Sequence, residues 1–213
     1  MKKLAQVFAG VWLLCAPILL LADATRSATL LVWGDSLSSA YGFGREQGWV
    51  ALLEERLAEH DITVVNGSIS GETTQGGASR LPAALAKHRP NWVILELGGN
   101  DGLRATPTWQ IEKNLTRMIE LSQDQDAEVL LLGMRIPPNY GPAYADAFAA
   151  LYPRVAKKSG TSLVPFFLEQ VATDPSLMQS DGIHPTATAQ PYLLDNVWPF
   201  LAKLLSATAT AGR

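Results

Sequence analysis

Five short apolar runs, each followed by an amphipathic segment, restrict this chain to a small set of folds. The runs are rich in Leu, Val and Ile and do not alternate cleanly with polar residues. That pattern is typical of parallel strands covered on both faces. The runs span 28–33, 62–66, 92–97, 128–133 and, more weakly, 162–166.

The segments between the runs repeat apolar residues at the i, i+3, i+4 spacing of helices that bury one face. The expected helices cover 49–57, 79–88, 111–122, 143–158 and 187–205. Alternating strands and helices predict an α/β fold, a three-layer α/β/α arrangement around one five-stranded parallel sheet. Because there is no internal repeat or long linker, we expect one domain over 25–213, with a frayed Ala/Thr-rich tail at 206–213.

The first 24 residues have the pattern of a secretory signal peptide. Lys2 and Lys3 precede an apolar run from Leu4 to Ala22, and Ala22-Asp23-Ala24 offers small residues at a cleavage site. Cleavage after Ala24 would place the protein in the periplasm or outside the cell and leave no stable membrane span. The alternative is an uncleaved anchor, since the run is nearly long enough to cross a bilayer.

Composition excludes several classes of protein. The chain has 213 residues, of which 47% are hydrophobic, and a formal net charge of −3. The apolar fraction argues against a disordered chain, and the weak negative charge argues against a nucleic-acid partner. One Cys, Cys15, lies in the leader, so no disulfide framework is expected.

Polar clusters follow three of the expected strands, and a fourth precedes the last helix. They occupy 34–38, 67–72, 98–101 and 181–185. In a parallel sheet the carboxyl ends of all strands meet at one edge, where open α/β sheets bind ligands. We therefore expect the four clusters to converge on one site.

Three residues of these clusters can form a nucleophilic centre. Ser36 stands at an expected strand-to-helix turn, and a serine hydroxyl attacks only when a base takes its proton. His184 is the candidate base. Asp181 can reach the other ring nitrogen of His184 if the loop between them makes one helical turn, and would then hold the correct tautomer.

A tetrahedral intermediate on Ser36 would also need hydrogen-bond donors for its oxyanion. The candidates are the backbone N–H groups of Ser36 and Gly71 and the side-chain amide of Asn100. Each residue also has a structural interpretation: Ser36 or Asn100 as a helix cap, and Gly71 or Asp181 as part of an ordinary turn. The catalytic interpretation depends on the whole set, in this order, at the strand ends.

The same residues give the chain a resemblance to a known family. Gly34-Asp-Ser-Leu-Ser38, Gly71, Gly98-Gly-Asn-Asp101 and Asp181-Gly-Ile-His-Pro185 are similar to the four blocks of the GDSL, or SGNH, hydrolases. The likeness runs from about Leu30 to Phe200 and is strongest to a bacterial periplasmic subgroup, through the stretches 96–104 and 136–141. It implies a flavodoxin-like fold, Ser36, Asp181 and His184 as triad, and Gly71 and Asn100 as oxyanion donors.

The chain departs from that subgroup at two positions and has its own sequence in one loop. Glu72 follows Gly71 where the subgroup usually has Asp, and Gly67 replaces a usual Ala. Residues 103–108 match a mobile substrate loop of the subgroup. Substrate contacts are expected on loops at the carboxyl edge, from Arg104, Thr106, Pro107 and Tyr140.

These observations predict a serine hydrolase that cleaves carboxylic esters and thioesters. The resemblance implies acyl thioesters, lysophospholipids, and aryl or short-chain esters as its small-molecule substrates. No metal or organic cofactor is expected, because His60 and His88 have no Cys or clustered carboxylates nearby. A monomer is expected, since no exposed apolar stripe demands a partner. A carbohydrate O-deacetylase and, outside enzymes, a flavodoxin-like ligand-binding module are the alternatives.

Overall fold

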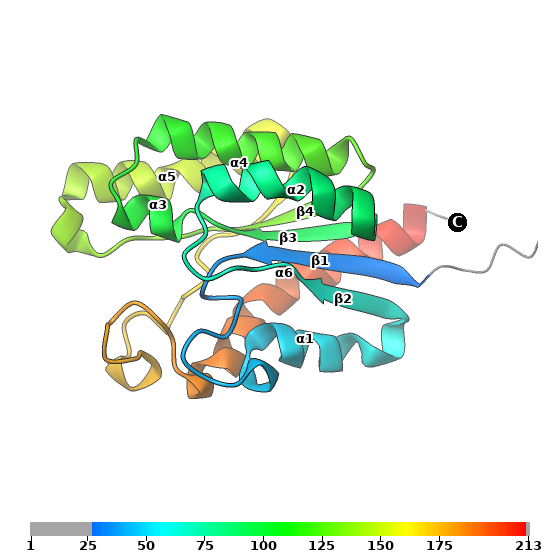
Figure 1. Cartoon of the computed structure of the whole chain (residues 1–213), viewed down its shortest axis with the longest axis horizontal. Helices are drawn as coiled ribbons and strands as arrows, with labels where there is room; N and C mark the ends of the chain where they lie inside the picture. The colour runs from blue at the N-terminus through cyan, green and yellow to red at the C-terminus, as the bar shows by residue number, and fades with distance from the viewer. Residues whose placement is uncertain (1–26, 212–213) are drawn as a thin grey trace, which may run out of the picture.

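A computed structural model describes residues 27–211 and shows one parallel sheet between two layers of helices (Figure 1). The strand order is β2-β1-β3-β4-β5, and all four neighbouring pairs are parallel. The strands are β1 (Ala28–Gly34), β2 (Ile62–Asn66), β3 (Trp92–Glu96), β4 (Glu128–Leu132) and β5 (Ser162–Val164). From β1 the chain adds β2 on one side of the sheet and then β3, β4 and β5 on the other. The strand order therefore changes between β1 and β3, and such sheets bind ligands at this position.

The helices divide between the two faces of the sheet. Figure 1 shows α1 and α6 on one face and α2, α4 and α5 on the other, with short α3 at the carboxyl end. Their bounds are α1 (Trp49–Leu57), α2 (Thr74–His88), α3 (Gly99–Leu103), α4 (Thr108–Gln123), α5 (Pro142–Ser159) and α6 (Gln190–Ala211). Single 3-10 turns occupy 45–47, 58–60, 138–140, 175–177 and 187–189.

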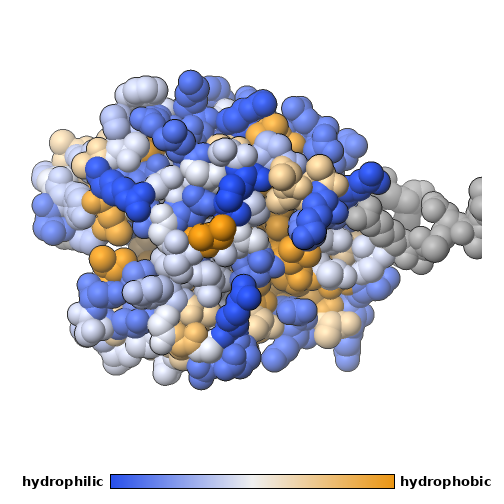
Figure 2. Space-filling model, viewed as in Figure 1, coloured by the Kyte–Doolittle hydropathy of each residue, from blue (hydrophilic) through white to orange (hydrophobic). Residues whose placement is uncertain are grey.

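The core lies on both sides of the sheet. Leu30, Leu31 and Val32 of β1 are fully buried, as are Ile94 of β3 and Leu130 of β4. Strands buried on both faces explain the unbroken apolar runs in the sequence. Figure 2 shows mainly polar side chains on one side of the molecule, with an apolar band between α1 and α2 over the edge strand β2.

The predicted fold class is confirmed, and the predicted elements differ from the observed ones at their ends; in addition, the short helix α3 is not among the predicted elements. The fifth strand stops at Val164, because Pro165 has no N–H to continue the ladder. Helix α2 begins at Thr74, five residues earlier than expected, since Thr73 caps it by accepting a hydrogen bond from the Gly76 N–H at 3.2 Å. Helix α6 continues through Ser206 to Ala211, where the sequence suggested a frayed tail.

The predicted leader, 1–24, lies outside the described residues. Within 27–211, no helix combines the length and apolar character needed to cross a membrane.

Candidate active site

Ser36 lies just beyond β1, in a run of tight turns over 36–42. The chain does not enter a helix directly after Ser36, because Ala40 takes a left-handed conformation (φ 61°); α1 begins at Trp49, as expected. The turn is closed by hydrogen bonds from the Ser38 and Ser39 N–H groups to the Asp35 carbonyl, at 3.3 and 3.1 Å. Ser36 is thus held next to the sheet, with only 9% of its surface exposed.

His184 and Asp181 reach Ser36 from the loop before α6. The Nε2 atom of His184 is 3.0 Å from the Ser36 Oγ, and its Nδ1 is 2.6 Å from Asp181 Oδ2. The loop is not the helical turn that the sequence suggested. Instead, Asp181 Oδ1 accepts hydrogen bonds from the N–H groups of Ile183 (2.9 Å) and His184 (3.0 Å), and Gly182 bends the chain at φ 66°.

These contacts keep Asp181 charged. Its partial burial alone would raise the pKa, but the hydrogen bonds from the His184 N–H, the His184 ring and the Ile183 N–H outweigh it and lower the pKa to about 2. The carboxylate can therefore accept from His184 Nδ1–H, which leaves Nε2 free to take a proton from Ser36. The three predicted triad residues are brought together in one hydrogen-bonded chain.

Tyr41 is a further contact of His184 that the sequence did not indicate. The two rings have centroids 4.3 Å apart and planes inclined at 34°. The Tyr41 carbonyl also accepts a hydrogen bond from the Gln179 side chain at 2.9 Å, which ties the Ser36 turn to the loop of His184.

The three expected oxyanion donors have different origins. Asn100 lies in α3 and donates through Nδ2 to Asp35 Oδ2 at 2.9 Å. Its second amide hydrogen has no acceptor among residues 27–211. Within the part of the chain that the structure describes, the N–H groups of Ser36 and Gly71 have no hydrogen-bond acceptor.

Gly71 belongs to the exposed loop after β2 and has φ 79°, a conformation that favours glycine. Ser70 beside it shares a 2.8 Å hydrogen bond with Ser39, which joins this loop to the Ser36 turn. On the other side, Arg104 donates to the Gly71 carbonyl at 3.4 Å. The loop of Gly71 is thus linked both to the Ser36 turn and to the end of α3 at this edge of the sheet.

Two buried acids beneath Ser36 were missed by the sequence analysis of charged groups. Asp35 and Glu96 are 2% and 0% exposed. Burial is the main cause that raises the pKa of Asp35 to about 6, against hydrogen bonds from the Leu37 N–H and Asn100 that lower it. Burial and the Asp35 charge raise the pKa of Glu96 well above its ordinary range. The position of Glu96 in the apolar run 92–97 was the feature of the sequence that could have indicated a buried acid.

The loop after α3 carries the expected substrate contacts. Arg104 and Pro107 are exposed, and Thr106 is half-buried. The hydroxyl of Tyr140 donates to the Leu103 carbonyl at 3.0 Å, and that of Tyr144 donates to the Thr106 carbonyl at 2.6 Å. The start of α5 and the turn before it therefore fix this loop next to the oxyanion donors.

The two departures from the resembled subgroup have structural explanations. Glu72 accepts a hydrogen bond from Arg80 Nε at 2.6 Å, so the loop of Gly71 is pinned to α2. The Arg80 guanidinium also lies 4.1 Å from the centre of the Trp33 ring. A Cβ on Gly67 would come within 2.7 Å of that ring, which explains a residue without a side chain there.

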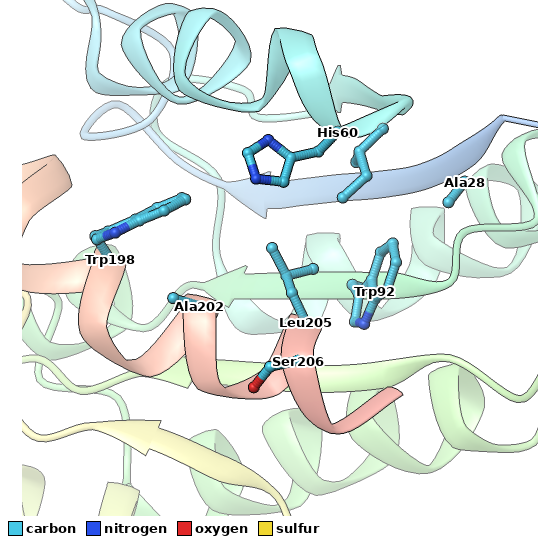
Figure 3. Close-up of a pocket in the computed structure, with 8 residues that line it drawn as sticks. Ala28, His60, Trp92, Trp198, Ala202, Leu205 and Ser206 are labelled. Carbon is cyan, nitrogen blue, oxygen red and sulfur yellow. The ribbon is translucent and has the colours of Figure 1, made fainter. Parts of the chain in front are cut away.

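One cavity lies far from Ser36, at the amino ends of β1, β2 and β3 (Figure 3). It has a volume of about 550 Å³ and is lined mostly by apolar side chains, among them Trp92, Trp198 and Leu205, with His60 at its border. The predicted site is instead at the opposite, carboxyl edge of the sheet. Residues 27–211 contain no group of three or more His, Cys, Asp or Glu side chains arranged to hold a metal ion.

Two bacterial proteins are similar to this chain over most of its length. The chain is 52% identical over 193 residues to the esterase TesA of Pseudomonas aeruginosa, covering 90% of this chain and 96% of that protein. It is 46% identical over 178 residues to the thioesterase 1/protease 1/lysophospholipase L1 of Escherichia coli, covering 84% and 85%.

A solved structure agrees with these relatives. The psychrotrophic esterase EstA from Pseudoalteromonas sp., in a form inhibited by monoethylphosphonate, superposes with a TM-score of 0.80 and 40% identity over 84% of this chain and 98% of its own. Residues 32–190 match the model of the GDSL-like Lipase/Acylhydrolase family. With its fold, its strand-end residues and these relatives, the chain belongs to the GDSL-like lipase and acylhydrolase family of carboxylic ester hydrolases.

Proposed function

We propose that this protein hydrolyses carboxylic esters and thioesters through an acyl-enzyme on Ser36. The observation that carries the proposal is the hydrogen-bonded chain from Asp181 through His184 to Ser36, with contacts of 2.6 and 3.0 Å. Both distances are short enough for proton transfer between the groups they join.

The geometry leads to a two-step reaction. The Ser36 Oγ forms a bond to the acyl carbon while its proton passes to His184 Nε2. The bond to the leaving alcohol or thiol then breaks, and His184 Nε2–H returns the proton to that group. In the second step water attacks the acyl carbon and gives a proton to His184 Nε2. The bond between that carbon and Ser36 Oγ then breaks, and His184 Nε2–H returns the proton to Oγ, which releases the acid and free Ser36.

The negative charge on the tetrahedral intermediate would be met by three donors. These are the Ser36 and Gly71 N–H groups and the second amide hydrogen of Asn100. None of these three hydrogens is used within the described part of the protein, so they do not have to break an existing bond to serve the oxyanion.

The substrate range is proposed from the relatives. Their names describe an esterase and an enzyme that acts as thioesterase, protease and lysophospholipase, so acyl thioesters, lysophospholipids, and aryl or short-chain esters are the substrates to test. Arg104, Thr106 and Pro107 are proposed substrate contacts because their loop borders Gly71, and Tyr140 because its hydroxyl donates to the Leu103 carbonyl of that loop. The protein would act as a monomer on these small molecules, without a nucleic-acid partner or cofactor.

A covalent label tests the nucleophile. An organophosphonate with a good leaving group should attach to Ser36 Oγ once per molecule and abolish turnover of a p-nitrophenyl ester. Ser36→Ala should neither react nor turn over substrate, whereas Ser79→Ala, an exposed serine of α2, should do both. Full activity or full labelling of Ser36→Ala would refute the mechanism. A panel of acyl-CoA, lysophospholipid, p-nitrophenyl and acetylated-sugar substrates separates the esterase from the O-deacetylase.

We also propose export to the periplasm or medium, with cleavage after Ala24. Mass spectrometry of the protein from fractionated cells measures both at once. A mature form beginning at Thr25 in the exported fraction is expected, and an intact chain retained in the membrane fraction would favour the anchor.

A further inference from the structure

Glu96, at the end of β3, has an unusual set of partners for a carboxyl group. Its side chain is fully buried. Its Oε2 accepts hydrogen bonds from the Ser38 hydroxyl at 2.7 Å and from the Asp35 N–H at 3.2 Å. Its Oε1 is also buried, yet no donor among the described residues reaches it. Leaving a buried carboxylate oxygen without a donor is unfavourable.

If Glu96 is protonated on Oε1, the nearby group that can accept this hydrogen bond is the carboxylate of Asp35. The register pairs Gly34 with Glu96 on adjacent strands, and the Asp35 N–H donates to Glu96 Oε2, so the two carboxyl groups are close enough for each to affect the pKa of the other. A Cβ on Gly34 would come within 2.5 Å of Glu96 Oε2, so this glycine makes room for the acid. Two adjacent buried carboxyl groups do not both ionise readily, so the pair retains one proton.

The surrounding donors indicate which acid holds the proton. Asp35 Oδ1 accepts from the Leu37 N–H at 3.1 Å, and Oδ2 accepts from Asn100 Nδ2 at 2.9 Å, as suits a carboxylate. Among the other ionisable groups, His184 favours a negative Asp35, whereas Tyr152 of α5 lies close enough to interact with both acids and with Asp101 of α3. Asp101 has its own donors in the Thr74 N–H and hydroxyl, at 2.8 and 2.7 Å.

We propose that Glu96 is a positioning residue for the esterase reaction: its protonated carboxyl donates from Oε1 to the Asp35 carboxylate, which in turn orients the amide of Asn100. A neutral acid in the core thereby fixes a donor for the oxyanion. The proposal rests on the proposed role of Asn100. Neither Glu96 nor Asp35 needs to touch the substrate, so the effect should be on kcat and not on KM.

Two substitutions test the proton. Glu96→Leu removes both the donor and the acceptor, and should lower kcat about tenfold to a hundredfold through a displaced Asn100 with little change in KM. Glu96→Gln keeps an acceptor for Ser38 and Asp35 N–H and an N–H donor for the Asp35 carboxylate, so it should restore most of that kcat. Glu128→Gln, at an exposed position on β4, is the matched control.

An infrared measurement tests the proton without relying on activity. At neutral pH the wild-type protein should show the carbonyl band of a protonated carboxyl, which Glu96→Gln lacks and Glu128→Gln retains. A wild-type protein without this band would overturn the proposal. So would a Glu96→Gln protein that unfolds or loses as much kcat as Glu96→Leu, because a charged carboxylate would then be required. Ser36→Ala, assayed in parallel, separates a failure of the catalytic mechanism from a failure of this one.

Discussion

The ring of Tyr41 lies against the ring of His184, with 4.3 Å between their centroids, although Tyr41 is 48% exposed. Tyr41 belongs to the same run of turns as Ser36, whereas His184 comes from a loop near the other end of the chain. The stacked ring therefore covers one side of the proposed base and limits its rotation away from Ser36.

Tyr41→Ala should lower kcat/KM about threefold to tenfold, since an aromatic pair contributes about 0.5–1.5 kcal/mol beyond its buried area. Tyr41→Phe should keep nearly all activity, because the contact is made by the ring. Tyr192→Ala, an equally exposed tyrosine on α6, is the control for loss of a surface ring. Steady-state kinetics on a p-nitrophenyl ester measures all three, and a loss in Tyr41→Phe equal to that in Tyr41→Ala would assign the effect to the hydroxyl.

Asn100→Ala should lower kcat by about 10²–10³ while KM changes little, as expected for a donor used in the transition state. The substitution also removes a hydrogen bond to Asp35, so thermal unfolding must be recorded beside the kinetics. A change confined to KM would instead place Asn100 in substrate binding.

The buried acid pair should make stability fall as pH rises from mildly acidic values. Folding raises the pKa of Asp35 from 3.8 to about 6 and that of Glu96 well above 4.5. Above the unfolded-state values, the folded protein therefore binds more protons than the unfolded chain, so the free energy of unfolding decreases with pH until the folded acids ionise.

Glu96→Gln removes one of these groups. Its stability relative to wild type should grow with pH above about 4.5, at up to about 1.4 kcal/mol per pH unit. Urea unfolding at a series of pH values measures this difference, and Glu128→Gln should show no such trend. A difference that shrinks as pH rises would mean that Glu96 is ionised in the folded protein.

Gly67→Ala should destabilise the protein by about 1–3 kcal/mol, because the new methyl group would overlap the Trp33 ring. The ring has little room to retreat, since Arg80 lies over it and its Nε1 donates to the Gly77 carbonyl at 3.2 Å. A double-mutant cycle with Trp33→Leu checks the cause: the cost of Gly67→Ala should largely disappear in that background. Equal costs in both backgrounds would contradict the contact.

Much of the fold follows from local patterns. Apolar runs such as 92–97 predict the strands because both faces of the sheet are covered, and α1 matches its predicted bounds from Trp49 to Leu57. Helix α3 does not follow from any pattern, since Gly99–Leu103 is too short to show periodicity and contains two glycines. Its formation depends on contacts with the rest of the protein.

The sequence predicts those residues of the proposed site that stand at the end of an expected strand or in a turn with a recognisable sequence. Ser36, Asn100 and His184 are of this kind. Tyr41 and Glu96 depend on long-range contacts. Glu96 also contradicts the usual rule that a charged residue at the end of an apolar run faces water. Such an exception can be predicted only when the residue on the neighbouring strand is known. For Glu96 that residue is Gly34 of β1.

Ser36 and Asn100 follow adjacent, hydrogen-bonded strands, whereas His184 is carried by a separate loop that is joined to the Ser36 turn by side-chain contacts such as Gln179 to Tyr41. The distance between the nucleophile Ser36 and the oxyanion donor Asn100 is therefore maintained for as long as the sheet is folded. The position of the base, His184, depends on fewer and weaker contacts. On heating, this enzyme should lose turnover before its sheet melts, and cooling from that stage should restore it.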